Sequence, residues 1–264
     1  MSGGADSLAL LVLAVGAGCE VTAVHVDHGL REGSPAEADV VAAAAGRFGA
    51  RFRAERVEVA PGPNLEARAR AARYAVLPAD VLTGHTADDQ AETVLVNLLR
   101  GSGLDGLAGM RPAGHPLLRL RRAETTALCR GLGLEPVEDP TNASPAHRRN
   151  RVRHELLPVL DAIAERDVAG LLARQATILR DEGDLLDALA ATIDATDARA
   201  LAAAPPALAR RAVRRWLTDG YPPDAATVER VLAVARGEAT ACDAGAGRRV
   251  SRSAMRLHLA TVAR

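Results

Sequence analysis

The sequence predicts an α/β domain with a parallel sheet, followed by a smaller and mainly helical domain. Residues 1 to about 140 alternate short β-rich runs with helical patterns, which is typical of a parallel sheet covered by helices on both faces. From about residue 161 the helical patterns become long and no strand signal separates them. The 264 residues, 48% of them hydrophobic, suffice for a sizeable core and a second small one. We therefore expect a first domain over residues 1–160 and a second over 161–264.

The elements of the first domain are predicted from hydrophobic periodicity and from end signals. The run VTAVHV within residues 20–26 indicates a buried strand, and two further β-rich runs follow it. The stretches between these runs are apolar or amphipathic at helical spacing, and glycines end two of them. The predicted strands are 20–26, 53–59 and 81–83, and the predicted helices are 7–15, 36–48, 66–77 and 87–99.

The second domain is predicted to consist mainly of helices. Prolines at positions 205, 206, 222 and 223 separate its helical patterns. Residues 249–262 are expected to form a small hairpin at the end of the chain. The predicted helices are 168–193, 207–217 and 226–235.

Composition excludes several classes of protein. The 33 basic and 33 acidic residues give zero net charge, so the total charge does not indicate a polyanionic partner. Every basic residue is arginine, which makes any single arginine a weak signal for a site. Cys19, Cys129 and Cys242 lack the spacing of a disulfide framework or a zinc site, and the apolar run 8–17 is too short to span a membrane. We expect a soluble cytoplasmic protein.

The clearest motif is SGGADS at residues 2–7, directly before an apolar helix. Adjacent glycines let the backbone approach a ligand, and the N–H groups at a helix N-terminus suit a phosphate. The hydroxyls of Ser2 and Ser7 can donate to phosphate oxygens, and Asp6 can hold a metal ion or orient the loop. The alternative is that Asp6 or Ser7 only caps the helix. The candidate phosphate-binding residues are Ser2, Gly3, Gly4, Ala5, Asp6 and Ser7.

A second motif carries four polar residues at helical spacing. His85, Asp88, Asp89 and Glu92 stand at i, i+3, i+4 and i+7, which places them on about one face of a helix. Three carboxylates and an imidazole in one pocket suit a cationic substrate. The structural alternative is that Asp89 forms a capping box with Thr86 and that acids in the first turn stabilise the helix dipole. Capping leaves Glu92, in the second turn, unexplained.

Further candidates lie at a strand end and in two arginine clusters. Asp27 and His28 follow the strand 20–26, where open α/β sheets place their ligands. Residues 147–154 contain four arginines, a basic stretch that can contact nucleic-acid phosphates. A second cluster, 210–215, recurs at helical spacing beside Trp216. Either cluster can also be an ordinary solvated face.

Taken in order, these motifs resemble the tRNA(Ile)-lysidine synthase family of PP-loop ATP pyrophosphatases. SGGADS looks like the PP-loop, and the match continues through VDHGLR, GHTADDQAET with RGSG, and EDPTN before RRNRVR, to about Leu160. The resemblance implies a Rossmann-like fold of the adenine nucleotide alpha hydrolase type. It also implies cleavage of ATP between its α and β phosphates and transfer of AMP to an oxygen of the substrate.

The resemblance also implies roles for the residues that match. Asp89 and Glu92 would recognise lysine, and the proton of its amine, whose reference pKa is about 10.4, has to be accepted by another group. Asp89, Glu92, His85 and Asp139 all remain candidates for that base. The nucleotide pocket would contain Asp27, His28, Arg70 and Arg73, and the tRNA would contact Arg148, Arg149, Asn150 and Arg153.

The implied reaction attaches free L-lysine to C2 of the wobble cytidine in the CAU anticodon of tRNA(Ile), through an adenylated intermediate, and changes codon reading from AUG to AUA. ATP activates the base, and Mg²⁺ is expected near Asp6 because the charge on pyrophosphate needs a cation. We expect the helical domain to bind the rest of the tRNA. A homodimer is compatible with the resemblance, and the sequence does not determine the oligomeric state.

Two departures from the family pattern keep other functions open. The family has a strand before its loop, whereas this sequence begins at Met1, so we expect the sheet to lack its first strand. The second domain is short, like the compact form of the family. The alternatives are a non-catalytic tRNA-binding remnant, a PP-loop tRNA thiolase and an amidotransferase synthetase domain. Thiolases of that kind use paired cysteines, which this sequence lacks.

Overall fold

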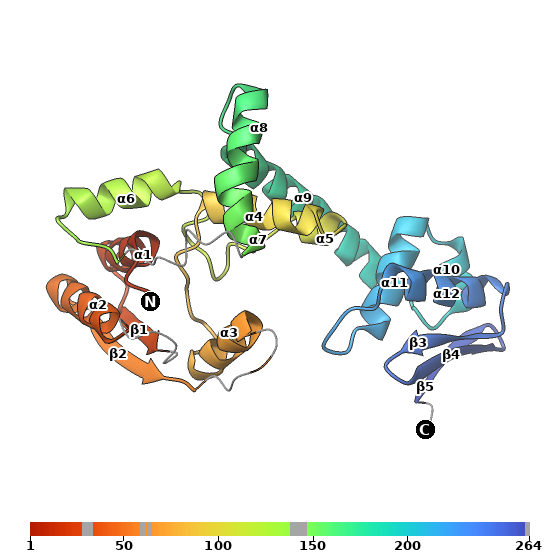
Figure 1. Cartoon of the computed structure of the whole chain (residues 1–264). Helices are drawn as coiled ribbons and strands as arrows, with labels where there is room; N and C mark the ends of the chain where they lie inside the picture. The colour runs from red at the N-terminus through yellow and green to blue at the C-terminus, as the bar shows by residue number, and fades with distance from the viewer. Residues whose placement is uncertain (28–33, 59–61, 63–64, 138–146, 262–264) are drawn as a thin grey trace. The chain divides into compact units, whose positions relative to one another are not determined.

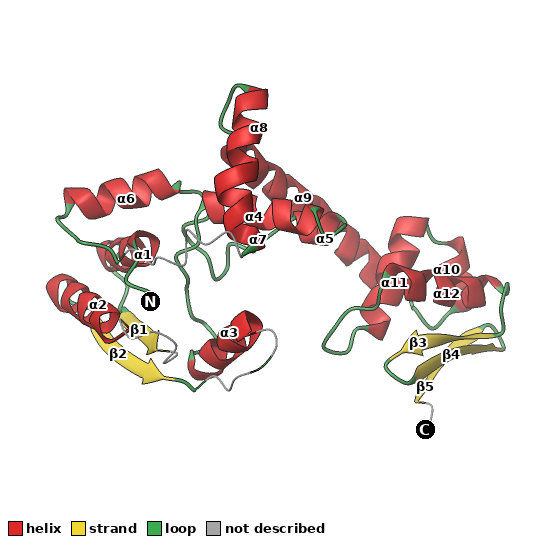
Figure 2. Ribbon diagram, in the orientation of Figure 1, coloured by secondary structure: helices red, strands yellow, loops and turns green. Residues whose placement is uncertain are grey.

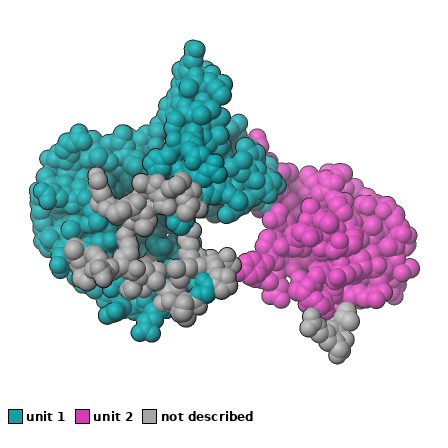
Figure 3. All heavy atoms as spheres, viewed as in Figure 1, with its two compact units in different colours: residues 1–179 teal, residues 180–264 magenta. Residues whose placement is uncertain are grey.

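The computed structural model describes residues 1–27, 34–58, 62, 65–137 and 147–261 of the chain. They form two compact units, Met1–Leu179 and Arg180–Arg264, which are coloured separately in Figure 3. The boundary between the units lies inside the long helix α9 (Val168–Ala191). Each unit has hydrophobic clusters of its own.

Unit 1 contains a parallel βαβ arrangement with helices around it (Figures 1 and 2). β1 (Thr22–Asp27) and β2 (Arg51–Arg56) pair in parallel, and α2 (Ser34–Phe48) is the crossover between them. Thr22 lies opposite Arg51, and Asp27 lies opposite Arg56. The other helices before α9 are α1 (Ala5–Gly16), α3 (Leu65–Val76), α4 (Ala87–Leu98), α5 (Leu104–Leu107), α6 (Arg122–Gly131), α7 (Arg148–Arg151) and α8 (Leu157–Ala164).

The first core of unit 1 joins α1 to the sheet and to two other helices. Leu8 and Leu11 of α1 and Val41 of α2 are at most 1% exposed. Ala23 of β1 and Cys129 of α6 belong to the same buried cluster. Because removing so much apolar surface from water is strongly favourable, this packing holds α1 firmly beside the sheet. The segment 2–7 therefore leads into a helix that is packed into a buried core of the unit.

The structure confirms the predicted α/β class, with one wrong element in its first half. The expectation of a strand at 81–83 is wrong, because this segment is irregular. Thr83 N–H donates at 2.9 Å to Gly114 O, which lies in a turn and not in a neighbouring strand. A strand requires a partner with which to form a ladder, and this contact is not one. The helix α6 was not predicted.

Residues 148–164 form a continuous helical run, where the sequence predicted only a basic stretch. α7 passes through a π-helical turn (Val152–Leu156) into α8. Such turns are rare and frequently occur at functional sites. Val152 and Leu157 are buried in one cluster with Ala91 and Leu95 of α4. This packing holds the arginine-rich run against α4.

Unit 2 combines the second half of α9 and three short helices with a small antiparallel sheet. The helices are α10 (Ala198–Ala203), α11 (Pro206–Leu217) and α12 (Ala225–Arg236), and the sheet has the order β3 (Ala241–Gly245), β4 (Arg248–Ser253), β5 (Arg256–Thr261). The predicted hairpin 249–262 is present as β4 and β5, whereas β3 was not predicted. Ala254 and Met255, between β4 and β5, have φ values of 47° and 64°, as a two-residue hairpin turn requires.

We predict that Leu201→Ala destabilises unit 2. Leu201 is 2% exposed and lies in the cluster shared by α10, α11, α12 and the sheet. Its truncation leaves a cavity, so the free energy of unfolding of unit 2 should fall by about 2–5 kcal/mol. Trp216 is the only tryptophan of the chain and packs against the same cluster, so its fluorescence during urea unfolding reports on this unit.

Leu189→Ala is the matched control, because Leu189 is 46% exposed on α9. An unfolding midpoint for Leu201→Ala no lower than that of the control would contradict the assignment of this core.

Candidate functional site

The loop before α1 has the backbone geometry of a ligand-binding turn. Gly3 has a φ of 72°, a region that favours glycine, and a Cβ there would lie 3.0 Å from Val137 Cγ2. The N-cap of α1 is Gly4, which has no side chain, so Asp6 and Ser7 lie inside the helix. The alternative that Asp6 or Ser7 caps the helix is therefore wrong. Ser7 Oγ instead donates to Gly4 O at 2.9 Å.

A second glycine, Gly84, packs directly against this loop. A Cβ on Gly84 would lie 2.5 Å from the carbonyl oxygen of Asp6 and 3.1 Å from the nitrogen of Ser7, closer than side chains approach. The backbone just before α4 therefore rests directly on the first turn of α1. This contact brings the two strongest motifs of the sequence, SGGADS and GHTADDQAET, against each other.

A cleft of about 1920 Å³ opens at this junction, entirely within unit 1. Pockets for small ligands usually have about 300–1000 Å³, so this cleft has room for a nucleotide together with part of a larger substrate. His28 and Asp139 lie outside the described residues. The predicted residues that line the cleft are Ser2, Gly4, Ala5, Asp6, Ser7, Asp27, Arg70, Arg73, His85, Asp89, Arg149, Asn150 and Arg153.

The start of α4 presents a buried carboxylate pair. Asp89 Oδ2 accepts from Thr86 N–H at 2.8 Å and from Thr86 Oγ1 at 3.0 Å, so the predicted capping box is present. Glu92, one turn further on, is completely buried. Capping thus occupies Oδ2 of Asp89. Its other oxygen, Oδ1, accepts hydrogen bonds from arginines that also contact Glu92.

Three arginines from two other segments converge on this pair. Glu92 accepts from Arg153 Nε at 2.6 Å and from Arg149 Nε at 2.7 Å. Asp89 Oδ1 accepts from Arg149 Nη2 and from Arg122 Nη2, both at 3.1 Å. A buried carboxylate requires such partners, because an unpaired one would lose its hydration without replacement. Two of the four residues predicted to contact tRNA therefore form ion pairs with the residues predicted to contact lysine.

The charge of these arginines changes the acidity of Asp89. Burial alone would raise the pKa of Asp89, but Arg122, the N–H of Thr86 and Arg149 outweigh it and hold the pKa below its ordinary value. Asp89 is consequently a carboxylate at neutral pH and a weak base.

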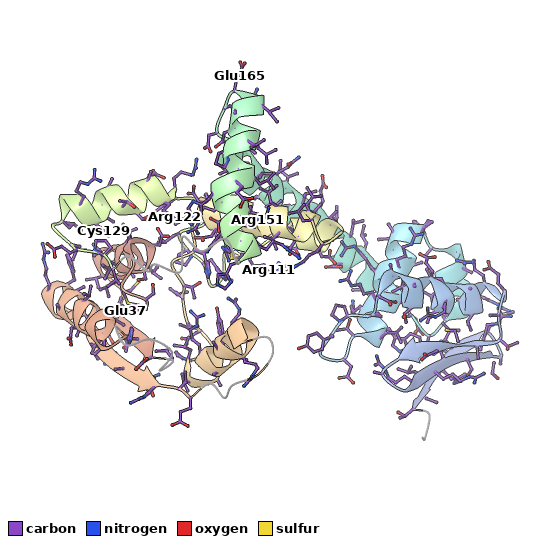
Figure 4. The ribbon with its side chains drawn as sticks, in the orientation of Figure 1. Glu37, Arg111, Arg122, Cys129, Arg151 and Glu165 are labelled. Carbon is purple, nitrogen blue, oxygen red and sulfur yellow. The ribbon has the colours of Figure 1, made fainter. Side chains whose placement is uncertain are left out.

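Arg122, which was not among the predicted site residues, also reaches the loop at the start of α1. Arg122 Nε lies 3.5 Å from Asp6 Oδ2, and Thr125 Oγ1 donates to the other oxygen of Asp6. Burial raises the pKa of Asp6, an effect that Thr125 and Arg122 only partly offset. Figure 4 shows Arg122 at the end of α6 that is nearest to α4.

His85 lies beside the carboxylate pair and is uncharged at neutral pH. Its Nδ1 lies 2.7 Å from Thr83 Oγ1, and its ring centroid lies 4.9 Å from that of His115. Burial lowers the pKa of His85 to about 4, and the opposite effect of Asp89 offsets this only in part. An imidazole with this pKa can donate or accept a hydrogen bond but is a weak base.

The remaining predicted residues lie at the edges of the site. Arg70 stacks over the ring of Tyr74 at 5.0 Å, and both side chains are exposed. Arg148, the first residue of α7, is also exposed, whereas Arg149 and Arg153 turn towards α4. Of the four residues predicted to contact tRNA, Arg148 is therefore exposed, whereas Arg149 and Arg153 face α4.

Other classes of site find little support among the described residues. Cys19, Cys129 and Cys242 are free thiols. Within the described ranges, no group of three or more His, Cys, Asp or Glu side chains is arranged to hold a metal ion. Among the described residues, no helix has the length and apolarity needed to cross a membrane.

Comparisons with known proteins give consistent results. Residues 1–160 match the PP-loop domain family, and residues 197–258 match the TilS substrate-binding domain. The chain is 51% identical to a tRNA(Ile)-lysidine synthase of Nocardia farcinica over 83% of this chain and 74% of that protein. It is 47% identical to one of Rhodococcus erythropolis (83% and 73%) and 44% identical to one of Mycobacterium leprae (83% and 74%).

A solved structure supports the fold. The U34-tRNA thiolase NcsA of Methanococcus maripaludis superposes with a TM-score of 0.54 over 68% of this chain and 71% of that chain. The two sequences are 19% identical, so the likeness concerns the fold alone.

We predict that Gly84→Ala weakens the binding of ATP. The new methyl group would collide with the carbonyl of Asp6 and push the first turn of α1 out of position. We expect the dissociation constant for ATP to rise about tenfold or more, which corresponds to about 1.4 kcal/mol, when it is measured by titration calorimetry. Gly16→Ala is the control, because no atom lies within 4 Å of a Cβ there. Equal ATP affinities of the two variants would contradict the prediction.

We predict that His85 makes unit 1 less stable in mild acid. The unfolded chain protonates this residue near pH 6.5, whereas burial lowers its pKa in the folded protein to about 4. The unfolded state therefore binds more protons between these values, so the free energy of unfolding falls as the pH drops through this window. Thermal unfolding at pH 7 and pH 5, followed by circular dichroism, should show a smaller loss of stability for His85→Gln. The exposed His154→Gln is the control; a loss in His85→Gln equal to that of the unmodified protein would refute this prediction.

Proposed function

The chain belongs to the tRNA(Ile)-lysidine synthase family, and from this premise we propose how its cleft performs the reaction. As a member of this family it is an ATP-dependent ligase that forms a C–N bond on tRNA(Ile). We propose that the acceptor atom is C2 of the wobble cytidine in a CAU anticodon and that the amine belongs to free L-lysine. The modified base would then pair with A and change codon reading from AUG to AUA.

The proposed chemistry has two steps, because the C2 oxygen of cytosine is a poor leaving group. First, this oxygen attacks the α-phosphorus of ATP, pyrophosphate leaves, and AMP is bonded to the oxygen. Second, the neutral ε-amino nitrogen of lysine attacks C2, the C–O bond breaks, AMP leaves with the oxygen, and one proton is released. The base has to be unstacked for both steps, which suits a nucleotide in a single-stranded loop.

We propose that residues 2–7 bind the phosphates of ATP. The N-terminus of α1 supplies N–H groups and the positive end of the helix dipole, and Ser2 adds a hydroxyl. Ser7 supports the turn through its bond to Gly4 O. Asp27, Arg70 and Arg73 line the same cleft and are proposed contacts of the nucleotide, together with His28, which lies outside the described residues.

We propose Asp6 as the protein ligand of Mg²⁺. Magnesium is usually held by one or two carboxylates together with the phosphates of the substrate, so a single carboxylate at the phosphate loop fits it. The raised pKa of Asp6, caused by burial, indicates a carboxylate that would gain from a nearby cation. When bound, the ion supplies positive charge at the phosphates.

We propose that Asp89 and Glu92 bind the ammonium group of lysine. The observation that supports this most directly is the buried Glu92 carboxylate one turn after Asp89, which Arg122 connects to Asp6 at the start of α1. Helix capping accounts for one oxygen of Asp89 and for nothing in Glu92. The depressed pKa values of Asp89 and His85 make both weak bases, so we assign them to binding and orientation. The base that accepts the proton, with Asp139 and Glu92 as candidates, stays a prediction.

We propose that the tRNA contacts the run 148–153 and unit 2. Arg148 is exposed at the start of α7, and Asn150 lines the cleft, so both can meet an anticodon loop that enters it. Arg149 and Arg153 are proposed to contact tRNA as well, after they release Asp89 and Glu92. Residues 197–258 match a substrate-binding domain, which supports a role for unit 2 in holding the rest of the tRNA. A homodimer stays a prediction.

The test is release of pyrophosphate by the purified protein with ATP, L-lysine and a tRNA(Ile) that carries a CAU anticodon. We expect release that requires all three and lysine incorporated into the tRNA. A remnant without activity would bind tRNA without turnover, and a thiolase or amidotransferase would not require lysine.

Glu92→Gln should selectively impair the use of lysine in this assay. Loss of a charge-assisted contact is worth about 1.5–3 kcal/mol, so the KM for lysine should rise about tenfold or more. Glu155→Gln is the control, because Glu155 is exposed and pairs with Arg151. Thermal unfolding of both variants separates loss of lysine binding from loss of folding, since Glu92 also forms ion pairs with Arg122, Arg149 and Arg153. An unchanged KM for lysine in a folded Glu92→Gln protein would remove Glu92 from the lysine site.

A further inference from the structure

We propose that Arg122 is a positioning residue that couples the binding of ATP to the binding of lysine. Its guanidinium contacts both the carboxylate at the phosphate loop and the carboxylate pair on α4. This inference rests on the proposed function, because it takes Asp6 as part of the ATP site and Asp89 and Glu92 as the lysine site.

The backbone of Arg122 is fixed by a neighbouring ion pair. Arg122 N–H donates to Asp88 Oδ2 at 2.7 Å. The preceding Arg121 holds the same carboxylate through two bonds, at 2.8 and 3.1 Å, and also pairs with Asp167. Asp88 lies on α4, so the first residue of α6 is attached to the helix that carries the proposed lysine site. A movement of Arg122 is therefore confined to its side chain.

The side chain of Arg122 connects the two proposed binding sites. Nε lies 3.5 Å from Asp6 Oδ2. Nη2 lies 3.1 Å from Asp89 Oδ1 and 3.4 Å from Glu92 Oε1. Arg149 and Arg153 contact Asp89 and Glu92 as well, so Arg122 is the member of this group whose contacts extend to the loop.

Both ligands require carboxylates that Arg122 contacts. An ammonium group at Asp89 and Glu92 brings a positive charge beside the guanidinium, and a divalent cation that enters with ATP does the same at Asp6. The ligand that binds first has to displace Arg122, whereas the second ligand finds its carboxylates already released. The displaced guanidinium can then face the phosphates of ATP, where a charge-assisted contact stabilises it.

This mechanism makes the two binding events mutually favourable. Coupling between ligands is reciprocal, so ATP must tighten lysine binding by the same factor by which lysine tightens ATP binding. Loss of the Arg122 side chain removes the shared displacement, so lysine alone should bind at least as tightly as before, while the coupling disappears. A purely structural role for Arg122 would instead weaken lysine binding both with and without ATP.

The experiment is calorimetric titration of L-lysine into the full chain, with and without ATP and Mg²⁺ and without tRNA, so that no product forms. For the unmodified protein we expect ATP to lower the dissociation constant of lysine about fivefold or more, the lower end of common allosteric coupling. For Arg122→Gln we expect a change of less than about twofold, with lysine binding in the absence of ATP no weaker than in the unmodified protein.

Two further variants keep the test decisive. Arg119→Gln removes an exposed arginine that precedes α6 and should keep the coupling of the unmodified protein. Arg122→Lys keeps the charge but lacks the forked guanidinium that reaches two sites at once, so it should show reduced coupling. This variant decides the question if Arg122→Gln does not fold.

The outcomes separate this inference from the proposed function. Coupling in Arg122→Gln or in a folded Arg122→Lys equal to that of the unmodified protein overturns the inference, and so does an unmodified protein that binds both ligands without coupling. An unmodified protein that binds neither ATP nor lysine overturns the proposed function itself.

Discussion

The candidate site depends on the burial of one carboxylate. Glu92 has no exposed surface, so the free energy lost with its hydration has to be recovered from cationic partners. Arg149 and Arg153 contact Glu92 at 2.7 and 2.6 Å and thereby help to hold the run 148–164 against α4. Arg122 adds a third cation from α6. The ion pairs thus join segments that lie about 60 residues apart in the sequence, around the position where the cationic substrate is proposed to bind.

The site has a rigid and an adaptable part. The loop 2–7 leads into α1, where Leu8, Ala9 and Leu11 are buried, and Gly84 packs against it without space for a methyl group. The arginines, in contrast, are partly exposed and hold their carboxylates through long side chains. Preorganised backbone suits phosphate groups, which have a fixed geometry, whereas exchangeable ion pairs suit a charged substrate that replaces one of them.

Local sequence patterns predicted those features of the site that depend on residues close together in the sequence. The capping box of Thr86 with Asp89 and the placement of Glu92 on the same helix face follow from spacing alone, and the structure has both the helix and the capping box. Arg122 could not be found in this way, because its partners are distant in sequence and because all 33 Lys+Arg residues of the chain are arginine. The direction in which Arg149 and Arg153 point likewise depends on tertiary packing, which holds their helical run against α4. The same is true of β3, a strand built largely from small residues.

The arginines that neutralise this acidic cluster also have a chemical consequence. A guanidinium stays protonated at any physiological pH and offers no lone pair for bond formation. Lysine side chains in the same positions would place primary amines next to an electrophilic carbon, where they could form an unwanted covalent adduct with the nucleic acid. With guanidinium groups as the surrounding cations, the free amino acid meets no competing nucleophile among the side chains that pair with Asp89 and Glu92.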